Sequence, residues 1–199
     1  RIKNRMTSRS TLAEACEAAN AFISRCNEHG STDGFEQFAL DLFAFQFEQN
    51  EAYANFCRSE KRTPETVTHW EAIPAVPTRA FKSLDLTVLP ESARTAVFHS
   101  SGTTQANRSR HHHNPATLSV YEASLWHWYS EHMVDETAGR LLFLFPQPSE
   151  AAESSLAHMM GTLAKRLAKR ENRFVADAQW RIDGRAAVDF LRDAATQNE

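Results

Sequence analysis

The residues best suited to binding chemistry form one short hydroxyl-rich segment, Ser100-Ser101-Gly102-Thr103-Thr104. Hydroxyl groups and free backbone N–H groups are the donors that a phosphate chain needs, and glycine lets the backbone approach a ligand closely. Two arginines and a histidine follow within a few residues, and an arginine can hold a phosphate or carboxylate through two parallel hydrogen bonds. The segment therefore predicts an anion site, whose candidate residues are Ser100, Ser101, Gly102, Thr103, Thr104, Arg108, Arg110 and His111.

The same hydroxyl-rich segment is also typical of a solvated turn between two strands. It departs from the GxxxxGK[ST] phosphate loop, because it contains no lysine and no predicted helix follows it directly. Residue types and spacing alone leave both interpretations open.

The predicted secondary structure around the segment alternates between strands and helices. A strand over Thr95–His99 leads into it, and Asn114-Pro115 begins a helix, with asparagine as the N-cap and proline in the first turn. Later elements are a strand over Leu141–Phe145 stopped by Pro146, a helix from Ser149 to about Lys169, a short strand over Arg173–Ala176, and a helix from Asp183 to about Ala195. This alternation indicates an α/β fold.

The N-terminal part has a different pattern, which predicts helices only. Thr11 and Glu14 form a capping-box pattern for a helix to about Cys26, ended by His29-Gly30, and Asp33 with Glu36 repeats the pattern. Phe35, Phe38, Ala39, Leu42, Phe43 and Gln46 then follow helical spacing, widened by Phe45 and Phe47, and a third helix holds Tyr53, Phe56 and Cys57. From residue 63 prolines force Ile73–Pro77 into an extended conformation. We predict a helical cap over residues 1–62 and an α/β domain over 63–199.

Composition narrows the function classes. The 199 residues include 22 Lys+Arg and 25 Asp+Glu, a formal net charge of -3, which argues against a general nucleic-acid binder. No apolar run approaches the roughly 18 residues that span a bilayer. Three cysteines with no CxxC pair and no signal peptide favour reduced thiols and a cytoplasmic location.

The run His111-His112-His113 suggests a metal site only at first sight. Consecutive strand residues point to alternate faces, so only His111 and His113 share a side, and no cysteine or carboxylate pattern completes a tetrahedral set. We therefore predict no metal-ligating residues.

An ordered set of motifs resembles the acyl-protein synthetase family, the fatty-acid-activating component of bacterial luminescence reductases, within the adenylate-forming enzymes. The hydroxyl-rich segment resembles their phosphate loop. The other matching stretches are Trp70–Lys82, Ser109-Arg110-His111, Phe145-Pro146, Ser154–Met159 and, in the helical start, Phe45–Glu48 with Tyr53 and Phe56-Cys57. The resemblance runs from about residue 35 to the end.

The resemblance implies a partial adenylate-forming domain that uses ATP and Mg²⁺ to activate a carboxylic or fatty acid as acyl-AMP. The acyl group would pass to a thiol of the enzyme and then to a reductase, which is the acyl-acceptor protein. Ser100, Ser101, Thr103 and Thr104 would hold the β- and γ-phosphates, and Gly102 would allow the close approach. Family members continue beyond this length into the adenine pocket and the catalytic lysine, so we expect the N-terminal half of such an enzyme and assign no catalytic residue.

Two other functions stay open. An aryl- or acyl-CoA ligase would use coenzyme A as the acceptor thiol. A non-catalytic binding or scaffold module would keep the Ser/Thr/Gly segment as a structural turn, and Gln105 favours it, because the resembling family usually has glycine there.

Overall fold

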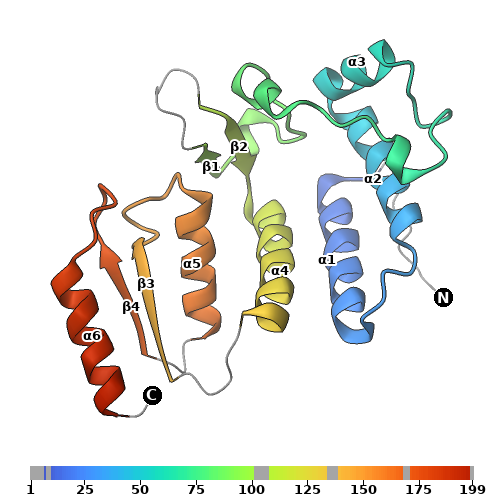
Figure 1. The fold of residues 1–199 in the computed structure, drawn as a ribbon. Coiled ribbons are helices and arrows are strands. Elements are labelled where there is room, and N and C mark those ends of the chain that lie inside the picture. The colour runs from blue at the N-terminus through green and yellow to red at the C-terminus, as the bar shows by residue number, and fades with distance from the viewer. Residues whose placement is uncertain (1–6, 8–9, 101–107, 134–138, 168–170, 198–199) are drawn as a thin grey trace. The chain divides into compact units, whose positions relative to one another are not determined.

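The chain forms two compact units, residues 1–127 and 128–199. The computed structural model describes the whole chain except residues 1–6, 8–9, 101–107, 134–138, 168–170 and 198–199 (Figure 1). Helices and strands occur in both units, so the predicted α/β class holds at that level. The domains expected at 1–62 and 63–199 stay a prediction. No helix within the described ranges is both long enough and apolar enough to cross a membrane.

Three helices open the first unit, as the sequence predicts. Helix α1, Leu12–His29, begins with the expected capping box of Thr11 and Glu14 and ends at Gly30, which has φ 60°. The second predicted capping box is wrong. Helix α2, Phe35–Gln49, has Gly34 as its N-cap at φ 83°, and no side chain caps it. Helix α3, Glu51–Ser59, begins where the Asn50 side chain accepts a hydrogen bond from the Tyr53 N–H at 3.1 Å.

The predicted apolar face of α2 does form core. Phe43 packs with Tyr53, Cys57 and Val67 in one buried cluster, and Phe45 packs in a second cluster with Ala15 of α1. The extended segment 73–77 is fastened to this core, because the Tyr53 hydroxyl donates to the Pro74 carbonyl at 2.9 Å. Three short 3-10 helices lie around this segment, at Trp70–Ala72, Thr78–Lys82 and Glu91–Ala93.

A two-stranded antiparallel sheet follows the short helices. Strand β1 covers Ala96–His99 and strand β2 covers Arg110–His113. Helix α4, Pro115–His132, starts directly after β2, and the Asn114 side chain accepts from the Thr117 N–H at 3.0 Å, as predicted for the N-cap.

The second unit is a parallel strand pair with helices. Strand β3, Arg140–Pro146, pairs in parallel with β4, Glu171–Ala176, and Pro146 is the last strand residue rather than the first residue beyond it. Helices α5, Ser155–Arg166, and α6, Gly184–Thr196, lie on either side of the pair (Figure 1). The prediction that α5 starts at Ser149 is wrong, because turns occupy residues 148–153 and Ser154 is the N-cap.

Candidate functional site

Strands β1 and β2 position the two ends of the hydroxyl-rich segment next to each other. His99 lies opposite Arg110 in the register, so Ser100 and Ser109 are the next pair along the hairpin. The Ser100 N–H donates to the Ser109 carbonyl at 3.2 Å, and the Ser109 N–H donates to Ser100 Oγ at 3.0 Å. Arg108 Nε donates to the Ser100 carbonyl at 2.6 Å. These three bonds fix the base of the connection and place the Arg108 cation there.

The pleat of β2 separates the residues that follow onto two faces. Arg110 and His112 lie on one face with Asp85, whose carboxylate is 3.0 Å from the Arg110 guanidinium and 3.7 Å from His112 Nε2. Arg94 reaches the same carboxylate at 3.0 Å. The Arg94 hydrogen bond and the Arg110 charge hold the pKa of Asp85 below its ordinary value, so Asp85 stays ionised at neutral pH.

Ser109 and His111 lie on the other face of β2. Ser109 is buried, and its Oγ is 3.3 Å from His111 Nε2. The His111 ring stacks on Phe81 with a centroid distance of 4.8 Å and an interplanar angle of 26°. Burial lowers the pKa of His111, with a smaller effect from His99, so the imidazole is neutral at pH 7 and can accept a proton or a hydrogen bond.

The structure describes four of the eight predicted site residues. Ser100, Arg108 and His111 lie at or near the base of the connection, while Arg110 is paired with Asp85. The other four, Ser101, Gly102, Thr103 and Thr104, lie outside the described residues.

Sequence reasoning missed Asp85, Phe81 and Ser109 as neighbours of the site residues. Phe81 and Ser109 stand inside stretches that carry the family resemblance, but nothing in their spacing assigned them a role. Asp85 lies 25 residues before Arg110 with no motif around it, so only the fold brings its carboxylate to β2.

The histidine run supplies no metal centre within the described ranges. No group of three or more His, Cys, Asp or Glu side chains there is arranged to hold a metal ion. His112 faces Asp85 and two arginines, and His113 Nδ1 is 3.2 Å from the Thr117 hydroxyl. His113 is therefore held by a hydrogen bond, whereas His112 Nε2 is buried without a hydrogen-bond partner.

Comparison with family models, curated proteins and solved structures found no match. The chemistry of the site therefore rests on its own geometry. At the hairpin base, the Ser100 hydroxyl can donate a hydrogen bond to an anion and Arg108 supplies a positive charge, beside a neutral His111. That arrangement suits recognition of a phosphate or carboxylate at the end of the hairpin.

Proposed function

We propose that this chain carries the phosphate-binding loop of an ATP-dependent, adenylate-forming ligase that resembles the acyl-protein synthetases. Such a ligase joins a carboxylic or fatty acid to AMP, releases pyrophosphate and passes the acyl group to a thiol. The observation that supports the proposal most directly is the closed base of the hydroxyl-rich connection. Three hydrogen bonds among Ser100, Arg108 and Ser109 hold both of its ends.

A fixed base matters because a phosphate site needs donors that are already in position. Binding a triphosphate to a loose loop would cost the conformational entropy of ordering that loop. Here both ends are set by the β1–β2 register, and the Arg108 charge is held at 2.6 Å from the Ser100 carbonyl. Arg108 would offset part of the phosphate charge, and the Ser100 hydroxyl would donate to a phosphate oxygen.

Mg²⁺ would enter with the nucleotide rather than on a protein carboxylate of the hairpin. Asp85 is the carboxylate that ion-pairs with β2, and it is already bound by Arg94 and Arg110. A magnesium ion commonly keeps several waters and binds through phosphates with one or two carboxylates. The donor set at the hairpin base therefore fits the phosphates of a magnesium nucleotide better than a free ion.

The first experiment is calorimetric titration of the chain with magnesium ATP. We expect measurable binding that is lost in Thr103→Ala and kept in the control Thr68→Ala, which removes an exposed hydroxyl far along the chain from the loop. Binding of equal strength in Thr103→Ala would refute the assignment of the loop. Exchange of labelled pyrophosphate into ATP, dependent on an added carboxylic acid, then tests adenylation itself.

A non-catalytic binding module is the second candidate function. The described strands on either side of the connection form an antiparallel hairpin, an arrangement that a structural turn alone would also give. In that case, no ATP would bind at millimolar concentration, and Ser101→Ala and Thr103→Ala would leave the behaviour of the chain unchanged.

If the ligase proposal is correct, adding coenzyme A or an acyl-acceptor protein to acyl-AMP shows which of the two thiols accepts the acyl group.

A further inference from the structure

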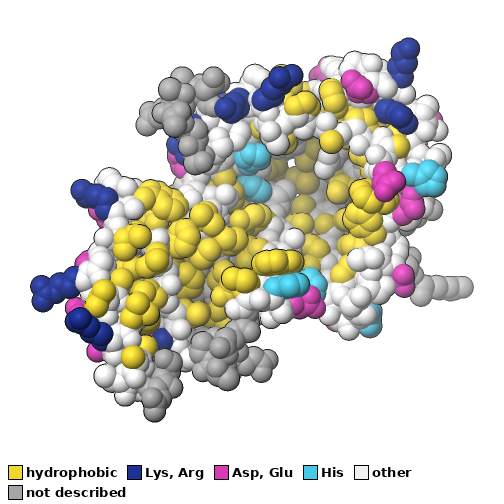
Figure 2. Space-filling model, in the orientation of Figure 1, with side chains coloured by type: hydrophobic (Ala, Val, Ile, Leu, Met, Phe, Trp, Pro, Cys, Tyr) yellow, Lys and Arg dark blue, Asp and Glu magenta, His cyan; other side chains and the backbone are white. Residues whose placement is uncertain are grey.

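The first unit contains a cavity of about 550 Å³ that is separate from the hairpin base. Its wall is built from all three N-terminal helices, the segments 74–76, 81 and 86–88, the strand β2 and the start of α4. The lining set contains neither Ser100 nor any residue from Arg108 to His111. Figure 2 shows the molecule hollowed in this region, with hydrophobic side chains over most of the visible wall.

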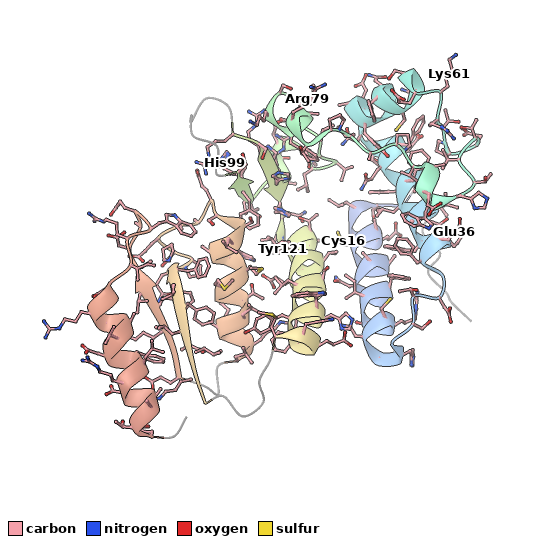
Figure 3. The ribbon with its side chains drawn as sticks, in the orientation of Figure 1. Cys16, Glu36, Lys61, Arg79, His99 and Tyr121 are labelled. Carbon is pink, nitrogen blue, oxygen red and sulfur yellow. The ribbon has the colours of Figure 1, made fainter. Side chains whose placement is uncertain are left out.

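The cavity has the size of a small-molecule site. Ligand pockets in proteins are typically about 300–1,000 Å³ and are lined mainly by apolar side chains with a few polar groups. Phe45, Phe81 and Val88 supply apolar wall here, and Cys16 lies on the side of α1 that faces α4 (Figure 3). Two hydrogen bonds join elements that form the wall: Asn20 of α1 donates to Ser119 of α4 at 3.0 Å, and the Tyr53 hydroxyl donates to the Pro74 carbonyl at 2.9 Å.

The cavity wall carries no formal charge. Among the described residues that line it, none is Lys, Arg, Asp or Glu. His112 lines the wall, and burial together with the Arg94 charge lowers its pKa against the opposing effect of Asp85, so it is neutral at pH 7. Burial also raises the pKa of Cys16, which keeps it a thiol rather than a thiolate. A charged group inside this cavity would lose its hydration without a counter-charge.

Most polar groups of the wall are already used by the protein. Asn50 accepts from the Tyr53 N–H, Thr87 accepts from the Leu89 N–H, and His113 is bonded with Thr117. Gln46 differs, because it lines the cavity and is exposed to solvent. The wall therefore offers a largely apolar surface, the exposed Gln46, and His112, whose Nε2 is buried without a hydrogen-bond partner.

We propose that this cavity binds an uncharged, largely apolar small molecule with a single polar end, whose polar end lies at Gln46. The ligand class follows from the volume, the uncharged wall and the place of the one exposed amide. The binding does not rest on the proposed ATP site, since the two sets of residues share no member.

Fluorescence of Nile red, an uncharged apolar dye, tests the site on the whole chain. We expect saturable binding that decanol displaces and that decanoate at about pH 8 displaces at least tenfold less well, because its carboxylate is ionised there. Ala19→Phe puts a ring into the wall and is expected to weaken dye binding about tenfold. Ala21→Phe makes the same change at an exposed position of α1 outside the lining set, and is expected to leave binding unchanged.

Thiol alkylation gives a second readout that needs no variant. Cys16 lines the cavity, whereas Cys26 of the same helix does not. Decanol is expected to slow the reaction of Cys16 with N-ethylmaleimide and to leave the rate at Cys26 unchanged, as measured by peptide mass. Non-saturable dye binding, equal binding in Ala19→Phe, equal displacement by decanoate, or no protection of Cys16 would each overturn the proposal. Magnesium ATP binding tests the other site and is independent of all four results.

Discussion

Gly161 of α5 is the position where adding one methyl group should have the clearest cost. A Cβ at this residue would overlap Cγ of Pro148 and would lie 3.3 Å from Pro148 Cβ. The pyrrolidine ring is closed on its own backbone, so it cannot rotate away as a flexible side chain would. The turn at residues 148–150, or the helix itself, has to move to make room.

Two opposing effects set the magnitude for Gly161→Ala. Alanine in a helix interior is favoured over glycine by about 1 kcal/mol. Overpacking a buried contact costs about 1–3 kcal/mol, and Gly161 is buried. We expect overpacking to win, with the free energy of unfolding lowered by up to about 2 kcal/mol. For a chain of this size that shifts Tm down by about 2–4 °C per kcal/mol.

Urea unfolding followed by circular dichroism measures the effect against two further variants. Gly184→Ala is the matched control, because no atom lies within 4 Å of its new Cβ, and its stability should be unchanged or slightly raised. Pro148→Ala removes the ring atoms that the new methyl group meets. In the double variant we therefore expect Gly161→Ala to become neutral or stabilising. A Gly161→Ala protein as stable as the Gly184→Ala protein would show that the contact with Pro148 is wrong.

Two further predictions follow from other described contacts. Thr11→Ala removes the acceptor for the Glu14 N–H in the capping box of α1 and should cost about 0.5–2 kcal/mol in urea unfolding, whereas the loss should be absent in Thr68→Ala. The pKa values of His111 and His112 are lowered in the folded chain, so the unfolded chain binds more protons than the folded chain as the pH falls through the ordinary value of 6.5, and the free energy of unfolding should fall there. Replacing both by Gln should flatten that slope, and an unchanged slope in the double variant would contradict the assigned cause.

Local sequence patterns predicted the start of a helix correctly where a side chain caps that start. The predicted Thr11–Glu14 capping box and Asn114 N-cap both begin helices in the structure, and the helix predicted from Asp183 has that residue as its N-cap. Asp33 and Glu36 have the same spacing, yet the N-cap of α2 is Gly34. The turn before α2 contains the left-handed Gly34 and the hydrogen bond from the Phe35 N–H to the Thr32 carbonyl. Neither feature belongs to a side-chain capping pattern.

The α5 boundary shows a different limit of sequence reasoning. Ser149 looked like a helix start, but residues 148–153 form turns and Ser154 caps the helix. The turn before the helix also packs against it, because Pro148 lies against Gly161, 13 residues later in the sequence. A packing contact of this kind lies outside any local pattern.

The candidate site divides in the same way between local and long-range information. The hydroxyl-rich segment and the flanking strand were visible in the sequence, because residue types and alternation are local properties. The role of Arg110 was not, because its guanidinium is taken by Asp85, 25 residues earlier. An anion bound at the hairpin would compete with that carboxylate for Arg110. Arg108 lies at the base of the connection itself, where its Nε donates to the Ser100 carbonyl. Arg108 is therefore the cation on which phosphate binding at this hairpin should depend most, and Arg108→Ala should weaken magnesium ATP binding more than Arg110→Ala.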